Sequence, residues 1–418
     1  MTGVKLGGVD SRSADINRRE ISMLSVGHSC VDICQGAVPA MLPFLIEHRG
    51  YSYAQATSLL LAMTFMSSML QPLFGYLADK KSLSWLLPAG VAIGGAGIAA
   101  VGLTHSYPMT LLVVGISGLG VGAYHPEGAR FANYVSGGRR GTGMSFYSVG
   151  GNIGFALGPI LVTPLILLFG IEGIVWMAVP LAIVAFLIFR ELPRLNSYRP
   201  SLAEAAAEKA ANLKPDRWIP FAGVATVAGF RSCVYFGLQA FVPLYFIGHL
   251  HSSTAIGNAA LTVLLVFGAI GTLVGGRMGD RVGNKLVMAV CFGVLTPLIL
   301  LFLLLGEIPA IAAMAAIGFF MVGTFSITVV MGQDFLPQRI GVASGITLGA
   351  AIGVGGFAAY FLGLLADQVS LTTVMLVIAA LPLPAFLISL VIPSDPDSGV
   401  EAGPAPETAA AAQPAMPT

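Results

Sequence analysis

Two ionisable residues stand deep inside apolar stretches of the sequence, an acid in the first half and a base in the second. Asp32 lies near the middle of the apolar run 21–46, and Arg231 lies near the middle of the run 218–247. A charge at bilayer depth costs about 2.5–3.5 kcal/mol on insertion scales, so such residues mark functional sites by default. Burial penalises the charged carboxylate, so Asp32 can bind and release a proton. Arg231 stays charged and offers a planar fork that suits phosphate, phosphonate or carboxylate groups.

The acid and the base admit two interpretations. They can form a permanent salt bridge that only fixes helix packing, although a buried ion pair gains little stability over apolar packing. Alternatively, an anion on Arg231 and a proton on Asp32 exclude one another, which is the logic of antiport.

Polar residues continue the helix faces that carry this acid and this base. His28 lies one helical turn before the acid, and Gln35 lies three residues after it. Tyr235 and Gln239 follow the base at i+4 and i+8. We expect His28 to relay a proton, and we expect the other three to contact substrate or to form hydrogen-bonded packing.

A second polar group lies within the stretch 122–159. Pro126, in the triplet His125-Pro126-Glu127, removes a backbone donor and should kink a helix. Glu127 and Arg130 are i, i+3 neighbours that can pair. The triplet fits a proton or substrate site and a cytoplasmic gate equally well. The gate network would comprise Asp79, Arg130 and Arg139.

The same stretch continues as a polar stripe. Ser145, Ser148 and Asn152 fall at i, i+3 and i+7 on one helix face. We include Asn152 and the nearby Tyr147 among the expected substrate contacts.

The composition predicts the environment of these residues. Of 418 residues, 56% are hydrophobic and 10% are charged, and the mean hydropathy is +0.84. A soluble domain carries about 25% charged residues, so this chain has too little polar surface to be one. Runs of about 20 apolar residues can cross a bilayer as helices, whereas an open sheet cannot. We predict twelve spans, at 21–46, 54–78, 84–104, 108–131, 142–168, 173–190, 218–247, 254–278, 284–305, 308–332, 340–366 and 371–392.

Positive charge predicts the orientation. With both termini on one side, that side receives 19 of the 21 Lys and Arg residues, the exceptions being Arg49 and Arg231. This asymmetry predicts cytoplasmic termini. The predicted segments are a disordered cytoplasmic N-terminus (1–20), a six-helix bundle (21–190), a cytoplasmic linker (191–217), a second six-helix bundle (218–392) and a disordered cytoplasmic tail (393–418).

The two halves repeat one another. The loop 75–80 matches 276–281, which ends in Asp280 and Arg281, at an offset of 201 residues. Parallel halves of this kind place a substrate site between them, near the membrane midplane.

The loop pattern Gly-x-x-x-Asp-Arg/Lys resembles the signature of the major facilitator superfamily. The His28-x-x-x-Asp32 pair and the string from His125 to Pro159 resemble its fosmidomycin resistance branch. The resemblance implies an all-α membrane protein with twelve transmembrane helices in two pseudo-symmetric six-helix bundles. It also implies a multi-pass protein of the bacterial inner membrane. The implied activity is proton-coupled export of small drug-like or organic anionic compounds by alternating access.

One further motif follows from the resemblance. Gly154-x-x-x-Gly158-Pro159 is similar to the family's antiporter signature, whose small residues allow close helix contact. This sequence departs from the family pattern in two places. Residues 160–162 stand where the family has trailing glycines, and the apolar residues 114–115 stand near the usual place of an arginine that many drug–proton antiporters carry. These departures shift the expected proton coupling to Asp32, His125 and Glu127.

The sequence also predicts several absences. No nucleotide-binding loop, Ser/His/Asp set, zinc spacing or nucleic-acid patch is present, so we expect neither an enzyme nor a bound cofactor. Cys30 and Cys34 share a helix face with His28 and Asp32, but we interpret them as small packed thiols and expect no metal. The expected partners are a small-molecule substrate, protons and the lipid bilayer, and we expect a monomer.

Two rival functions fit the same fold. One is a proton-coupled uptake symporter for a small organic anion, and the other is a membrane sensor that does not transport.

Overall fold

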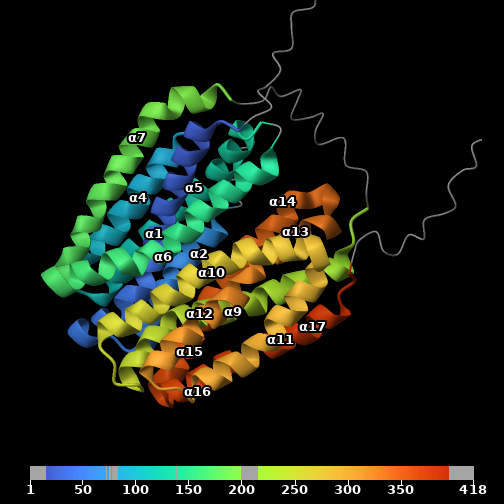
Figure 1. The fold of residues 1–418 in the computed structure, drawn as a ribbon. Helices are drawn as coiled ribbons and strands as arrows, with labels where there is room; N and C mark the ends of the chain where they lie inside the picture. The colour runs from blue at the N-terminus through green and yellow to red at the C-terminus, as the bar shows by residue number, and fades with distance from the viewer. Residues whose placement is uncertain are drawn as a thin grey trace, which may run out of the picture.

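The computed structural model describes residues 16–71, 73–74, 77, 83–137, 139–198 and 215–394. These residues are helical and contain no strand. Figure 1 shows their helices in two groups, one built from the first half of the chain and one from the second. Asp79 and most of the predicted termini and linker (1–20, 393–418 and 191–217) lie outside the described residues.

The described residues of the first half form six principal helices. Their bounds are α1 Arg18–Arg49, α2 Tyr53–Met69, α4 Leu86–Ala100, α5 Tyr107–Val135, α6 Arg140–Phe169 and α7 Ala178–Asn196. Short 3₁₀ turns, Val101–Leu103 and Ile171–Met177, follow α4 and precede α7.

The second half has more breaks. Its bounds are α9 Trp218–Gly248, α10 Thr254–Val282, α11 Asn284–Phe302, α12 Glu307–Gly323, α13 Phe325–Phe335, α14 Ile340–Ser344, α15 Ala351–Gln368, α16 Leu371–Ala380 and α17 Pro382–Val391. A 3₁₀ turn, Pro337–Arg339, precedes α14, and a π-helical segment, Gly345–Ala350, joins α14 to α15.

The described helices confirm the predicted membrane fold. Eleven helical segments are long and apolar enough to cross a bilayer, and α2, with 17 residues, supplies the remaining predicted crossing. The tenth predicted span is broken at Thr324, whose hydroxyl donates to the Met321 carbonyl and so competes with the helix ladder. The twelfth is broken before Pro382, which has no N–H to donate.

Ion pairs fix the ends of α1 and α7. Glu20 is buried, and its Oε1 lies 2.5 Å from Nε of Arg194, while Arg19 pairs with Glu191. These contacts hold the first turn of α1 in place, so the prediction of disorder is wrong for residues 18–20. They also extend α7 past the predicted end of the sixth span, into the segment predicted as linker.

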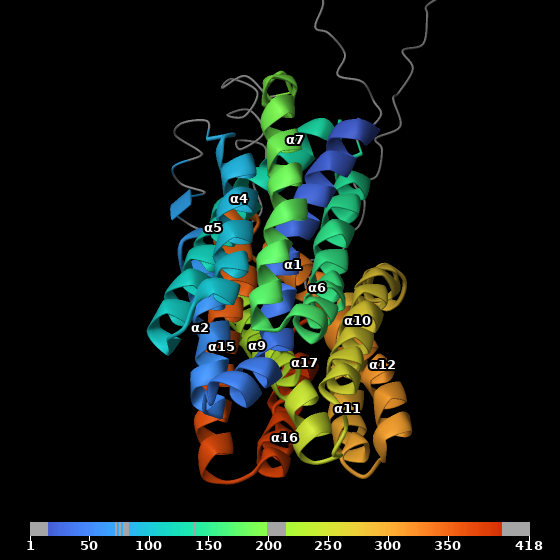
Figure 2. The same ribbon diagram turned by 90° about the vertical axis from the view of Figure 1, so that its left-hand side faces the viewer.

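Glycines bring α6 against α1. A Cβ at Gly154 would stand 2.9 Å from Cβ of Asp32, and one at Gly158 would stand 2.7 Å from Cα of Gly36. Only residues without a side chain permit this approach. Figure 2 shows α7 along the outside of the same half, where it packs on α4 and α1. The acid therefore lies on a helix that packs mainly against its own half.

Among the described residues, two polar side chains form hydrogen bonds that join the halves. Asn258 of α10 donates to the Ala40 carbonyl of α1 (3.0 Å) and to the Thr163 hydroxyl of α6 (2.8 Å). This amide is buried, so the bonds hold α10 against the first half.

The second connection is a carboxylate at the start of a helix. Asp367 in the last turn of α15 accepts hydrogen bonds from the backbone N–H groups of Tyr53 (2.8 Å) and Ala54 (2.9 Å). These are the first residues of α2, whose own cap is formed by Ser52 with Gln55. A carboxylate there also interacts favourably with the helix dipole. Asp367 thus fastens the second half to the first at the end of the molecule beside Gly50.

Candidate functional site

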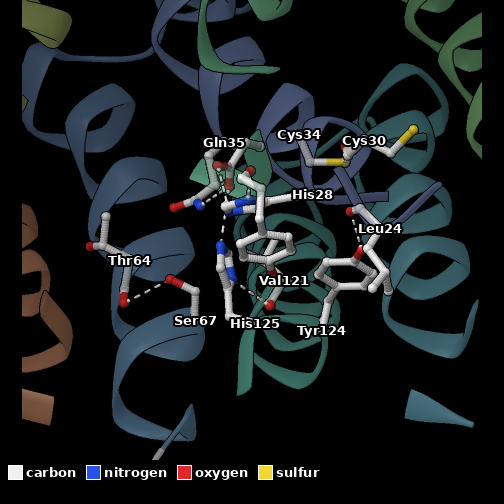
Figure 3. Close-up of polar contacts among 12 residues, drawn as sticks. Leu24, His28, Cys30, Cys34, Gln35, Thr64, Ser67, Val121, Tyr124 and His125 are labelled. Atoms are coloured by element: carbon white, nitrogen blue, oxygen red, sulfur yellow. Dashed lines mark hydrogen bonds and ion pairs between the residues drawn. The ribbon is translucent and has the colours of Figure 1, made fainter. Parts of the chain in front are cut away.

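A cluster of three ionisable side chains surrounds the centre of α1. Oδ2 of Asp32 lies 3.3 Å from Nε2 of His28, and Oδ1 lies 3.3 Å from Nε2 of His125. The amide nitrogen of Gln35 donates to Oδ1 (2.9 Å). Figure 3 shows both imidazoles directed at the same point, one from α1 and one from α5. The carboxylate is 4% exposed.

The helices explain why these groups meet. His28 and Asp32 are separated by four residues on α1, so they share a face. His125 arrives from α5, in the turn loosened by Pro126. Tyr147 of α6 stacks on the His28 ring, with ring centroids 4.1 Å apart. The cluster therefore depends on three helices of the first half.

Hydrogen bonds determine where the imidazole protons lie. Nδ1 of His28 is 2.8 Å from the Tyr147 carbonyl, and Nδ1 of His125 is 2.8 Å from the Val121 carbonyl. A carbonyl oxygen only accepts, so each Nδ1 must carry the proton. In a neutral ring, Nε2 is then an acceptor, yet each Nε2 faces a carboxylate oxygen.

This arrangement favours a bound proton. Each Nε2···Oδ contact is attractive only when a proton lies on one of its two atoms, and with no such proton three acceptor groups converge in a buried site. The side chain of His125 is 21% exposed, compared with 5% for Asp32. His125 is thus the member of the cluster most open to exchange with the surroundings.

Glu127 lies apart from these contacts although it is two residues from His125. Its Oε1 accepts from the backbone N–H of Leu83 (3.2 Å) and lies 3.7 Å from Nη1 of Arg130. The side chain is 1% exposed. The triplet is therefore divided: its histidine faces α1, and its acid binds the backbone just before α4.

Arg231 lies in α9 and is 2% exposed. Its Nη1 donates to the Thr328 hydroxyl (2.9 Å) and to the Phe325 carbonyl (3.4 Å). The guanidinium also lies over the Phe325 ring, 4.4 Å from the centroid. Among the described residues, no carboxylate oxygen lies within 4.0 Å of it. The salt bridge with Asp32 is not formed in this structure, and the buried cation lacks a counter-ion from the described chain.

The expected substrate contacts occupy different settings. Gln239 is fully buried, and both of its amide atoms lack a hydrogen-bond partner among the described residues. Tyr235 lies within electrostatic range of both the acid and the base, and its ring contacts Phe155 of α6. The Tyr147 hydroxyl is buried and unpaired within the described chain. Asn152 is half-buried on α6, and Gln35 is bound to the acid.

The predicted gate residues lie on several elements, and Asp79 is outside the described residues. Asp280 and Arg281 are exposed at the end of α10, and Arg139 is exposed before α6. Arg130 contacts Glu127. Gly154 and Gly158 belong to the α1–α6 seam, with Pro159 in the next position of α6.

Several contacts could not be inferred from the sequence. Thr328 and Phe325 are about a hundred residues from Arg231, and only the packing of α13 on α9 brings them together. Asp367 fell between two predicted spans, where an acid is unremarkable. The two cysteines that share a helix face with His28 and Asp32 do not join the imidazoles, because Cys34 donates to the Cys30 carbonyl instead.

Comparisons with known proteins agree with this architecture. The model of the Major Facilitator Superfamily matches residues 24–360. An uncharacterized MFS-type transporter, YfnC, of Bacillus subtilis (strain 168) is 31% identical over 378 residues, which cover 89% of this chain and 92% of that protein. The fosmidomycin resistance protein of Escherichia coli (strain K12) is 30% identical over 366 residues, which cover 87% and 90%. These relatives are transporters or resistance proteins rather than enzymes.

Solved structures share the fold. A bacterial homolog of the human lysosomal transporter Spinster, in an inward-facing and unoccupied conformation, has a TM-score of 0.71 at 15% identity, covering 92% of this chain and 98% of that chain. A variant of the nucleoside transporter NupG has a TM-score of 0.70 at 15% identity, covering 90% and 99%.

Proposed function

Because this chain belongs to the Major Facilitator Superfamily, we propose that it exports small drug-like or organic anionic compounds in exchange for protons. The fosmidomycin resistance relative supports export. The observation that carries the proton coupling is the pair of Nε2···Oδ contacts at Asp32, each of which needs a proton. The buried Arg231, without a carboxylate partner in the described chain, supports an anionic group on the substrate.

The proposed cycle divides these roles between the halves. The cluster at Asp32 loads protons on the outer side and releases them on the cytoplasmic side. Arg231 binds the anion, and Gln239 offers it an unpaired donor and an unpaired acceptor. The halves rock about the midplane, so that the site opens to one side at a time. The bias of Lys and Arg supports placement in the bacterial inner membrane with cytoplasmic termini.

Proteoliposomes test the direction of coupling. With fosmidomycin as the probe, vesicles that are acidic inside should accumulate it as protons leave, and a protonophore should abolish the accumulation. Accumulation only in vesicles that are alkaline inside would instead indicate a symporter. An absence of proton-dependent movement in either gradient would reject coupling altogether.

The contact of Asp367 with α2 should favour one conformation of the cycle. Asp367→Ala removes a helix cap worth about 1 kcal/mol, which shifts a two-state equilibrium by about fivefold. The halves should therefore separate more often at the Gly50 end. Pulsed EPR between spin labels at His105→Cys and Leu304→Cys, two exposed positions in different halves, measures this separation in a Cys233→Ser background.

Ser253→Ala is the matched control for that experiment. Ser253 caps α10 by accepting from Ile256 N–H, so its loss removes a cap within one half. The control should leave the EPR distance distribution unchanged. Equal distributions in Asp367→Ala and in the parent protein would show that Asp367 does not hold the halves together.

A further inference from the structure

We propose that His28, Asp32 and His125 form a binding site for a divalent transition metal of the Zn²⁺ type, and that an occupied site stops transport. Metal binding stands on the geometry of these three residues alone. Its inhibitory effect rests on the proposed function, which places protons on the same atoms.

The distances suit the metal. One ligand atom from each residue can be chosen so that all three lie within 4.8 Å of one another. Zn–N and Zn–O bonds are about 2.0–2.2 Å long, so the edge of a tetrahedron around zinc measures about 3.3–3.6 Å. Both N···O separations in the cluster are 3.3 Å, and they run to different oxygens of the Asp32 carboxylate. Small side-chain rotations would bring one of these oxygens and both imidazoles around a single zinc ion.

The surroundings orient the ligands. Each Nδ1 is bound to a backbone carbonyl, of Tyr147 or of Val121. Such outer bonds fix the tautomer and leave Nε2 free to ligate, which is the usual arrangement of histidines that bind metals. Gln35 steadies the carboxylate through Oδ1.

The chemistry of the donors selects the class of metal. Two imidazoles and one carboxylate match the three-ligand set of open zinc sites, where a fourth position is left for water or another ligand. Ca²⁺ and Mg²⁺ prefer shells made of oxygen. Soft Cu(I) prefers thiolates and thioethers, and Cys30 and Cys34 contact one another instead of the cluster.

Access and consequence follow from the helices. The partly exposed side chain of His125 gives the ion a route into the site. Because His125 is on α5 and the other two ligands are on α1, a bound ion links two helices. Among the described residues, Cys34, Tyr124, Tyr147 and Tyr235 also lie within electrostatic range of Asp32. They add no formal charge near neutral pH, so none of them opposes a cation.

Binding is tested on the untagged full-length protein in detergent at pH 7.5. Titration calorimetry with Zn²⁺ should give one site per chain, and His125→Gln and His28→Gln should each weaken it by at least about 100-fold, more than the loss of an outer-shell partner. His48→Gln is the matched control, because His48 is also on α1, lies 4.0 Å from Glu47 and is about half exposed. It should bind Zn²⁺ as the parent protein does. Absence of a stoichiometric site, or equal affinity in His125→Gln, would overturn the proposal.

A second variant guards against simple misfolding. His125→Cys keeps a ligand at this position, so Co²⁺ should bind and produce the intense near-ultraviolet absorption of a thiolate–cobalt bond, which the parent protein should lack. Absence of this band in the folded variant would exclude His125 from the site. In proteoliposomes, Zn²⁺ should inhibit transport by the parent protein. It should leave substrate exchange by the His125→Gln variant unchanged. If Zn²⁺ binds but proton-driven transport is never detected, the metal site stands and the proposed function fails.

Discussion

Replacing Asp32 with Asn is expected to abolish transport that is driven against a gradient while leaving downhill exchange of substrate measurable. Asn has nearly the same shape and can still accept the hydrogen bond from Gln35. Its amide cannot take up or release a proton. The contacts with His28 and His125 therefore no longer involve a proton shared with a carboxylate. In proteoliposomes the accumulation ratio should fall to about one, with exchange reduced at most several-fold.

Asp216→Asn is the control for the Asp32 variant. Asp216 pairs with Arg339 (3.2 Å) just before the starts of α9 and α14, outside the cluster, and the Arg339 side of this pair is exposed. Its variant should keep the full accumulation ratio. Undiminished uphill transport in Asp32→Asn would remove the acid from the coupling mechanism and transfer the role to another group.

Replacing Arg231 with Ala is expected to weaken binding of an anionic substrate far more than binding of a neutral one. A hydrogen bond to a charged group contributes about 1.5–3 kcal/mol, so the dissociation constant for fosmidomycin should rise about 10- to 150-fold. A neutral ligand of similar size should lose less than about threefold. Binding to the purified variants by calorimetry separates the two cases.

Arg277→Ala removes one positive charge from an exposed position on α10 and serves as the control. It should leave both affinities unchanged. Thr328→Val tests the positioning of the guanidinium, because it retains the charge but removes the 2.9 Å hydrogen bond. We expect a smaller loss than in Arg231→Ala. Equal losses for anionic and neutral ligands in Arg231→Ala would mean that the side chain maintains the shape of the site rather than recognising charge.

The parts of this molecule that depend on local pattern could be predicted from the sequence. Apolar runs of bilayer length predicted the helices, because a chain that crosses lipid must satisfy its backbone hydrogen bonds internally. The spacing of four residues placed His28 beside Asp32, and the glycines at 154 and 158 predicted close helix contact. Each of these conclusions needs only the geometry of one helix or one small-residue contact.

The parts that depend on packing between distant segments could not be predicted. His125 reaches Asp32 only because α5 presents its loosened turn to α1, and no spacing in the chain encodes that approach. The salt bridge between Asp32 and Arg231, one of two interpretations of the sequence, is not formed in this structure. The repeat placed both residues on corresponding helices, but the ring of Phe325 and the hydroxyl of Thr328 engage the guanidinium instead.

The division of contacts between the two halves has a mechanical consequence. The partners of Asp32 belong to α1 and α5, and those of Arg231 belong to α13. A rigid rotation of one half against the other would leave both sets of bonds intact and alter only the gap between them. The distance between Asp32 and Arg231 would then differ from one conformation to the next. Because electrostatic interaction weakens with distance, each conformation would set how strongly a charge at one residue acts on the other.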